Sequence, residues 1–124
     1  MQVYNIKGTE DSPGVLLDKE HESFWLTGDS YPENILSVYN PIFEWVDEYV
    51  KQPNPTTVFN FKMDYFNTAS AKSILDILTQ LESLHHSGND VLIKWHYKEN
   101  DEEMLDGGEG YAELVDIPFE FIEI

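Results

Sequence analysis

The chain has no cysteine, few basic residues and no long hydrophobic run. Without cysteine it can form no disulfide, no thiolate nucleophile and no cysteine-ligated zinc site. No stretch approaches the roughly 18 apolar residues that a membrane-spanning helix needs. Residues 1–7 lack the basic region followed by an apolar region that marks a signal peptide. We therefore expect a cytoplasmic protein that does not insert into a membrane.

Basic residues number 7 against 24 acidic ones, which gives a net charge of -17. Such a surface repels DNA, RNA and anionic lipids, so we expect no nucleic-acid partner. A positively charged protein is the partner that this charge favours. The alternative is that the acidity only keeps the protein soluble. The composition leaves both interpretations open.

The length and composition fit one folded domain that spans residues 1–124. A chain of 124 residues can bury a hydrophobic core, and contents of 41% hydrophobic and 14% aromatic residues argue against disorder. Six segments have the composition of β-strands, and Pro118 puts the last of them at a strand start or at an edge of the sheet. These segments are residues 3–6, 15–18, 23–27, 57–63, 91–97 and 117–124.

Two segments repeat apolar residues at helical spacing. The first covers residues 41–50, with Asn40 as its N-cap and Pro41 in its first turn. The second covers residues 68–86 and stops at Gly88, which can adopt the left-handed conformation.

Three further segments are predicted to lack regular secondary structure. Residues 28–34 are rich in turn formers, and residues 34–39 predict an irregular turn before the first helix. Residues 98–110 are acidic and contain glycine, which indicates a loop with at most one helical turn.

This order of elements predicts an α/β domain with a mixed β-sheet and helices packed on it. A crossover from strand 57–63 through helix 68–86 to strand 91–97 should make those two strands parallel.

The residues that could carry chemistry form no recognisable catalytic or metal-binding motif. His85 and His86 are adjacent, which is not the i, i+4 spacing of two ligands on one helix face. Residues 99–103 are rich in carboxylates but lack the glycine of a calcium loop. Residues 107–110 lack the Lys-Ser/Thr of a phosphate loop. We expect no metal, no cofactor and no enzymatic activity.

An enzyme or ligand-binding domain remains as an alternative built on His96. A lone histidine at the end of a strand is more often a packed or hydrogen-bonded residue than a catalytic one. If His96 acts with the loop at Asp29 and Ser30, these groups should converge in a cleft.

Polar residues gather where strand 57–63 gives way to helix 68–86, at Asn67, Thr68, Ser70 and Ser73. Asn67 or Thr68 can cap the helix by accepting a hydrogen bond from its first turn, which contributes roughly 1 kcal/mol. The same position also suits a phosphate, because added negative charge lies at the positive end of the helix dipole. Lys72, one turn further on, is the nearby cation that could pair with it.

Several strings of residues together resemble a known family. They are Gly28-Asp29-Ser30-Tyr31-Pro32-Glu33-Asn34, a helix containing Trp45, Asn67-Thr68-Ala69-Ser70 leading into Ile74-Leu75-Asp76-Ile77-Leu78, and Trp95-His96-Tyr97. This order and spacing resembles the SiaC family of bacterial biofilm-regulation phosphoproteins, over about residues 8–122.

The resemblance implies a fold similar to the STAS domains of anti-sigma-factor antagonists. It implies a non-enzymatic switch. A partner kinase is expected to phosphorylate it on Thr68, and a PP2C-type phosphatase is expected to remove the phosphate. The unphosphorylated form is expected to bind and activate a GGDEF diguanylate cyclase and so to promote cyclic-di-GMP synthesis. The alternative within this resemblance is an anti-sigma-factor antagonist in a partner-switching pathway. The residues expected to contact partners are Asn67, Ala69, Ser70, Lys72, Asp29, Ser30 and Tyr31.

Two positions depart from the family pattern. Ala69 stands where the resemblance leads us to expect a serine, which could affect the choice of kinase. Pro41 interrupts what is a continuous helix in the family, and we expect it only to shift the start of the helix.

Overall fold

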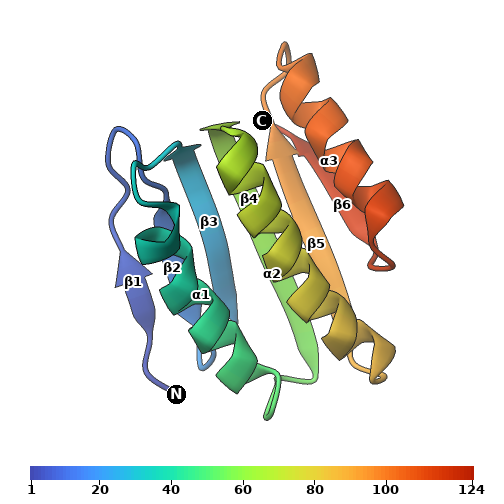
Figure 1. Ribbon diagram of the computed structural model, residues 1–124. Helices are drawn as coiled ribbons and strands as arrows, with labels where there is room; N and C mark the ends of the chain where they lie inside the picture. Colours follow the sequence, from blue (N-terminus) through green and yellow to red (C-terminus); the bar gives the residue numbers. More distant parts are fainter.

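The computed structural model describes all 124 residues, which form six strands and three helices (Figure 1). The elements are, in chain order, β1 (Tyr4–Ile6), β2 (Gly14–Asp18), β3 (Ser23–Ser30), α1 (Ile35–Tyr49), β4 (Thr56–Phe66), α2 (Thr68–His86), β5 (Asp90–Tyr97), α3 (Glu102–Leu114) and β6 (Phe119–Glu123). None of the three helices has the combination of length and hydropathy that a membrane span requires.

All six strands form one sheet in which each strand pairs with the next in the chain. The pairs β1–β2 and β2–β3 are antiparallel, whereas β3–β4, β4–β5 and β5–β6 are parallel. The predicted mixed α/β architecture is therefore confirmed. The crossover through α2 makes β4 and β5 parallel, as expected, and Pro118 precedes β6 at the edge of the sheet.

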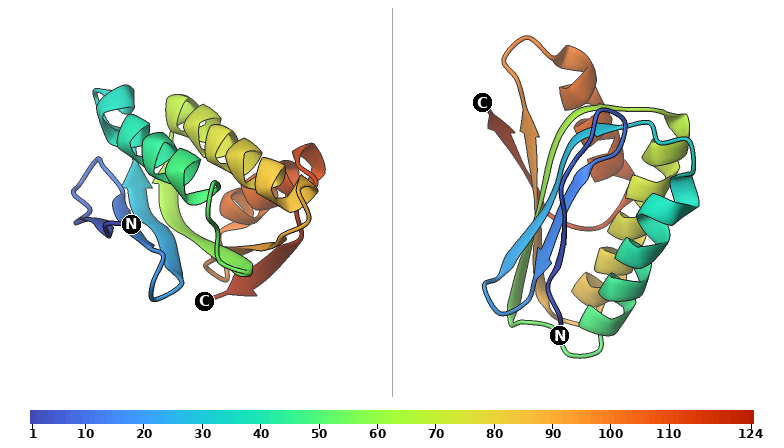
Figure 2. Two further views of the ribbon diagram at one scale, coloured as in Figure 1. Left: turned by 90° about the horizontal axis from the view of Figure 1, so that it is seen from below. Right: turned by 90° about the vertical axis from the view of Figure 1, so that its left-hand side faces the viewer.

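The three helices lie on one face of the sheet and leave the other face without a covering element (Figure 2). Alternate side chains of β2 to β5 point under the helices and form the core with the buried faces of α1 and α2. The largest fully buried side chains include Trp95, Tyr39, Tyr49, Phe59 and Phe61. This one-sided packing puts the ends of helices and strands, and not their faces, at the two rims of the domain.

The prediction of a loop over residues 98–110 is wrong, because residues 102–114 form α3. Asp101 caps this helix by accepting a hydrogen bond from the Met104 backbone N–H at 3.0 Å. Tertiary packing overrides the low helix propensity of its glycines: Trp95 Nε1 donates to the Met104 carbonyl at 2.8 Å, and Gly108 lies directly against the indole.

The prediction that the first helix starts at Pro41, after an Asn40 cap and an irregular turn over residues 34–39, is also wrong. Helix α1 begins at Ile35, with Asn34 as its N-cap, and passes through Pro41. Proline has no N–H to donate to the preceding turn, which normally ends a helix. Here Tyr39 and Ile42, on either side of the proline, are both fully buried and hold the helix against the sheet.

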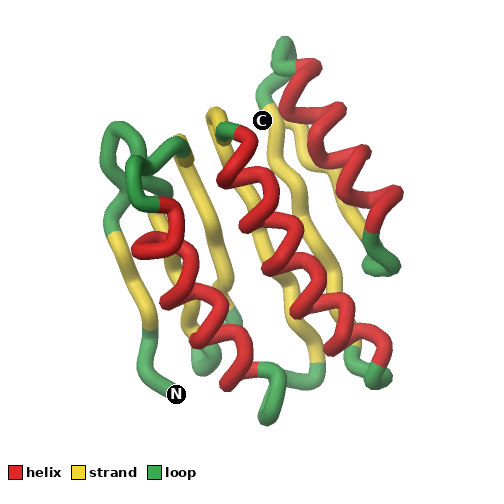
Figure 3. The backbone as a smooth tube through the Cα atoms, in the orientation of Figure 1, coloured by secondary structure: helices red, strands yellow, loops and turns green.

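Two strands extend further than their composition predicts. Strand β3 runs to Ser30, so residues 28–30 belong to the sheet and not to a connector. The register shifts between Gly28 and Asp29, and Gly28 takes a φ of 84°, which glycine adopts without strain. Strand β4 runs to Phe66, which leaves one residue between it and α2 (Figure 3). Both strands therefore carry their side chains up to the same rim as the start of α2.

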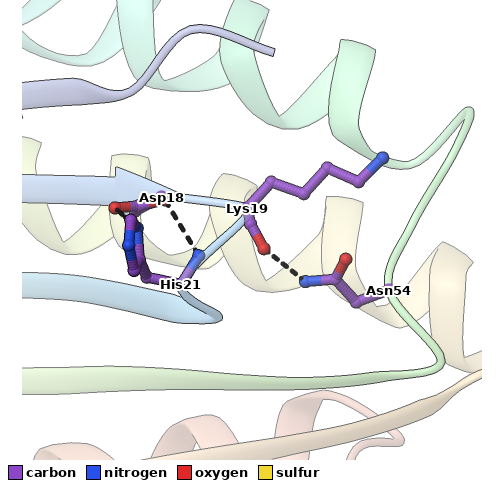
Figure 4. Close-up of polar contacts among 4 residues, drawn as sticks. All are labelled: Asp18, Lys19, His21 and Asn54. Atoms are coloured by element: carbon purple, nitrogen blue, oxygen red, sulfur yellow. Dashed lines mark hydrogen bonds and ion pairs between the residues drawn. The ribbon is translucent and has the colours of Figure 1, made fainter.

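The opposite rim is closed by the turn between β2 and β3 (Figure 4). The Asp18 carboxylate accepts hydrogen bonds from the His21 backbone N–H at 3.1 Å and from His21 Nδ1 at 2.8 Å. The bond from the His21 backbone is the main cause that holds the pKa of Asp18 below its usual value. Asn54 donates to the Lys19 carbonyl at 2.9 Å and so ties this turn to the connection between α1 and β4.

Candidate functional site

Thr68 is the first residue of α2 and is exposed at the rim where β3 and β4 end. The chain reaches it directly from β4, with only Asn67 in between. The first-turn N–H groups of a helix have no partners within the helix, and they carry the positive end of its dipole. An exposed hydroxyl at this point is accessible to another protein and lies where added negative charge is well tolerated.

Asn67, not Thr68, is the N-cap of α2. Its side-chain oxygen accepts a hydrogen bond from the Ser70 backbone N–H at 2.9 Å, and its own N–H donates to the Ser30 carbonyl at 3.0 Å. The sequence left the cap open between the two residues, and the structure assigns it to the asparagine. The Thr68 hydroxyl is consequently not needed for capping, so a chemical change at that oxygen leaves the cap intact.

Three buried hydroxyl groups lie beneath this junction. Ser30 Oγ is 2.7 Å from the Tyr39 hydroxyl and 2.8 Å from Ser70 Oγ, and Ser70 Oγ donates to the Ser30 carbonyl at 2.9 Å. All three residues have no exposed surface. They join the end of β3, the first half of α1 and the first turn of α2.

The number of protons fixes the direction of these bonds. Ser70 has a single hydroxyl proton, and it goes to the Ser30 carbonyl. The Ser30 hydroxyl must then donate to Ser70, and the Tyr39 hydroxyl must donate to Ser30. Burial raises the pKa of Tyr39, which keeps this donor protonated. Every hydroxyl in the chain of bonds is used, so Ser30 and Ser70 hold the junction together from below.

The other residues predicted to contact partners lie around Thr68 with different exposures. Ala69 is exposed beside it, and Asp29 is half-buried. Tyr31 is 41% exposed and packs edge-on against Tyr65, which is 53% exposed, at a ring separation of 6.0 Å. Ser30 and Ser70, by contrast, are inaccessible to a partner in this structure. The exposed members form a rim surface that combines aromatic rings with a carboxylate.

Lys72 lies one turn beyond Thr68 and is largely exposed. Its Nζ is 3.2 Å from Asp76 Oδ2, four residues further along the helix. An exposed i, i+4 pair of this kind contributes only about 0.3–0.5 kcal/mol. The side chain can therefore leave Asp76 at little cost and pair with a group at Thr68, which is also four residues away.

Helix α3 supports the first turn of α2, which the sequence did not predict. The Tyr111 hydroxyl donates to the Ala71 carbonyl at 2.7 Å. Burial raises the pKa of Tyr111, so the hydroxyl stays a donor throughout the physiological range. The sequence did not predict the contribution of Tyr39 or of Tyr111, because neither tyrosine is near Thr68 in the sequence. Only the fold brings them together.

The alternative of a catalytic cleft at His96, Asp29 and Ser30 is wrong. His96 lies on the face of the sheet without helices, where its Nε2 is 3.0 Å from Asn60 Oδ1 and its ring stacks on Trp25. Ser30 is buried on the helix side, bonded to Tyr39 and Ser70. Ser30 and His96 therefore lie on opposite sides of the sheet, and no cleft brings the predicted groups together.

The cap assignment leads to a stability prediction. We expect Asn67→Ala to lower the free energy of unfolding by about 1 kcal/mol, since the first turn of α2 loses its side-chain acceptor. Asn40→Ala is the matched control, because Asn40 is an exposed residue inside α1 and should change stability by less than about 0.5 kcal/mol. Urea denaturation of both variants measures this, and an equal loss in both would contradict the assignment.

Known proteins similar to this chain agree in sequence and in fold. Residues 6–124 match the family described as SiaC family regulatory phosphoprotein. An uncharacterized protein of Pseudomonas aeruginosa (strain UCBPP-PA14) is 30% identical over 119 residues, which cover 96% of this chain and 94% of that protein.

Two crystal structures from Pseudomonas aeruginosa, each 29% identical, have the same fold. Apo-SiaC superposes with a TM-score of 0.91, and the alignment covers 98% of this chain and 99% of that one. SiaC in a complex with the diguanylate cyclase SiaD, whose activator it is, superposes with a TM-score of 0.92 over the same shares of both chains. With the family match over almost its whole length, the chain belongs to the SiaC family of regulatory phosphoproteins.

Proposed function

We propose that this protein is a non-enzymatic switch that binds and activates a diguanylate cyclase while Thr68 is unphosphorylated. A partner kinase phosphorylates Thr68, and a PP2C-type phosphatase removes the phosphate. The proposal places these reactions in the cytoplasm, where the kinase finds ATP and the cyclase finds GTP.

The observation that carries the assignment of Thr68 is its exposure beside two buried serines. Thr68 is exposed at the start of α2, whereas Ser70 has no exposed surface and Ser73 is only 7% exposed. A kinase must surround the acceptor hydroxyl, so it can reach Thr68 without opening the fold. Phosphorylation of Ser70 would instead require the breaking of its bonds to Ser30.

The cyclase is supported as partner by the relative that binds one. SiaC of Pseudomonas aeruginosa is the activator of the diguanylate cyclase SiaD in their crystal structure, and this chain shares its fold over nearly the full length of both. The exposed rings of Tyr31 and Tyr65 next to Thr68 suit a protein contact, because aromatic side chains are enriched at interfaces. A phosphate on Thr68 would then add charge at the edge of that contact.

The phosphosite is tested by mapping. After incubation with the kinase of the same organism and ATP, mass spectrometry should find phosphate on Thr68 and on no other residue. The variant Thr68→Ala should accept none, while Ser73→Ala, the matched control, should be modified as the wild type is. Phosphate confined to another residue, or full modification of Thr68→Ala, would overturn the assignment.

A further inference from the structure

The face of the sheet that carries no helix has a distinct composition. One row of neighbouring strand residues crosses it from Leu16 through Trp25, Asn60 and Lys94 to Glu120. The row opposite to it in the pleat, which includes Phe24, Phe59 and Ile93, is buried under the helices. The face is thus exposed to solvent although half-buried apolar side chains occur on it, at Leu16, Trp25, Val58, Leu92 and Ile122.

Its centre is rigid and partly aromatic. The indole of Trp25 stacks on the His96 ring at 5.3 Å, and His96 Nε2 is hydrogen-bonded to Asn60 Oδ1. The Asn60 amide also donates to the Phe24 carbonyl at 3.3 Å, so His96 is the donor in its bond to Asn60. Asn60 is only 8% exposed although no helix covers it. These bonds hold a flat platform in place before any partner arrives.

Two lysines without ion-pair partners flank the platform. Lys94 is next to Asn60 across the strands, and Lys62 follows Asn60 two residues later on β4, near enough for its charge to act on His96. The lysines that form ion pairs are Lys51, Lys72 and Lys98. Burial and these two neighbouring lysines hold the pKa of His96 below its usual value, while Glu120 opposes them.

This distribution of charge differs from that of the helix side. The three helices contain ten carboxylates and a single lysine, Lys72. In a chain with 24 acidic and 7 basic residues, two neighbouring lysines without ion-pair partners make the centre of this face a local exception to the acidic surface. Of the carboxylates on this face, Asp18 and Asp64 are engaged by His21 and Lys98 nearer the strand ends. Glu120 lies next to Lys94 across the strands and forms no ion pair, so the two lysines outnumber it at the centre. The remaining positive charge complements a carboxylate that approaches Lys62.

The size of the face also suits a stable complex. From the usual spacing of strands and residues, the six-stranded sheet presents about 600 Å². Each partner in a complex of standard size buries about 800 Å². A partner that spans this face and part of the rim would reach that area.

We infer that the helix-free face is a second docking surface, and that it binds an acidic segment of the diguanylate cyclase. Carboxylates of that segment pair with Lys62 and Lys94, and an apolar side chain between them packs on Trp25. This contact rests on the proposed function, and it anchors the cyclase independently of Thr68. Strand β4 puts Lys62 about 13 Å from Phe66 at the Thr68 rim, beyond a Debye length of about 8 Å at physiological salt.

The test compares two charge reversals that change the net charge equally. In titration calorimetry with the purified cyclase, Lys62→Glu/Lys94→Glu should bind at least tenfold more weakly than the wild type. Lys19→Glu/Lys51→Glu, which alters lysines away from this face, should change the affinity less than threefold. The milder Lys62→Gln/Lys94→Gln should show an intermediate loss, and circular dichroism should show that all three variants fold.

The outcomes separate this inference from the proposed function. If the wild type binds the cyclase and Lys62→Glu/Lys94→Glu binds equally well, the second surface is overturned and the proposed function stands. If the wild type does not bind the cyclase, both the second surface and the proposed function are overturned. In a Thr68→Asp background, Lys62→Glu/Lys94→Glu should lower the affinity for the cyclase by the same factor as it does in the wild type, because distant sites act additively. Self-association of the wild type that the reversal abolishes would assign the face to a second copy of this chain and overturn the inference.

Discussion

Phosphorylation of Thr68 is expected to weaken cyclase binding about 100-fold, because it places almost two negative charges, which are costly to desolvate, beside the exposed rings of Tyr31 and Tyr65 at the contact rim. Asp29 already lies at this rim, so the phosphate adds to charge of the same sign. Titration of unmodified and fully phosphorylated protein with the cyclase measures the change. Equal affinities for the two forms would contradict the proposed switch.

The same modification should leave the fold intact. Thr68 is exposed, the cap belongs to Asn67, and the positive end of the α2 dipole favours the added charge by about 0.3–1 kcal/mol. The circular dichroism spectrum should therefore be unchanged, and the free energy of unfolding should stay within about 1 kcal/mol of the unmodified protein. An unfolded phosphorylated protein would show that phosphate acts by disrupting the domain.

A mimic and its control extend this experiment. Thr68→Asp should weaken cyclase binding in the same direction but less, since aspartate carries a smaller charge than phosphate. Thr79→Asp puts an equal charge at another exposed threonine of α2, about three turns further on. It should leave the affinity unchanged. An equal loss for Thr79→Asp would mean that net charge alone, and not the position at the rim, governs binding.

Gly108→Ala is expected to be the most destabilising of the conservative substitutions proposed, at about 1–3 kcal/mol. A Cβ at this position would lie 2.5 Å from the indole of Trp95, and Trp95 is fully buried and held through its bond to the Met104 carbonyl. Neither the helix nor the indole can move aside without the loss of that packing. Thermal or urea unfolding measures the effect, and unchanged stability would contradict the close approach of α3 to the sheet.

Gly110→Ala is the matched control in the same helix. Nothing lies within 4 Å of a Cβ at Gly110, so the substitution meets no obstacle. Alanine should instead raise the free energy of unfolding by about 0.5–1 kcal/mol, through its higher helix propensity. The two substitutions are chemically identical, but they should change the free energy of unfolding in opposite directions. A loss of stability in both would show that α3 is not helical at these positions.

The local pattern of residues was sufficient to predict most strands, the full extent of α2 and the position of Thr68 at its start. These features depend on alternation, helical spacing and capping chemistry within a few neighbouring residues. The family match over residues 6–124 confirms the resemblance that the strings around Gly28, Asn67 and Trp95 indicated.

Where the prediction failed, distant contacts outweighed local preference. Helix α3 contains three glycines, and it forms because Trp95 needs the close approach that Gly108 permits. Helix α1 runs through Pro41 because Tyr39 and Ile42 anchor it on both sides. In each case the residues that decide the outcome lie on another element or on the opposite side of a local break.

The support beneath Thr68 and the face with Lys62 and Lys94 could come only from the folded chain. Ser30, Tyr39 and Ser70 are up to 40 residues apart in sequence, yet their hydroxyls form one chain of hydrogen bonds. Local sequence alone thus determined that a hydroxyl group stands at the start of α2, where the helix dipole favours added negative charge. The packing of the sheet against three helices decided which neighbours hold it, because hydrogen bonds and apolar contacts between strands depend on register and not on nearness along the chain.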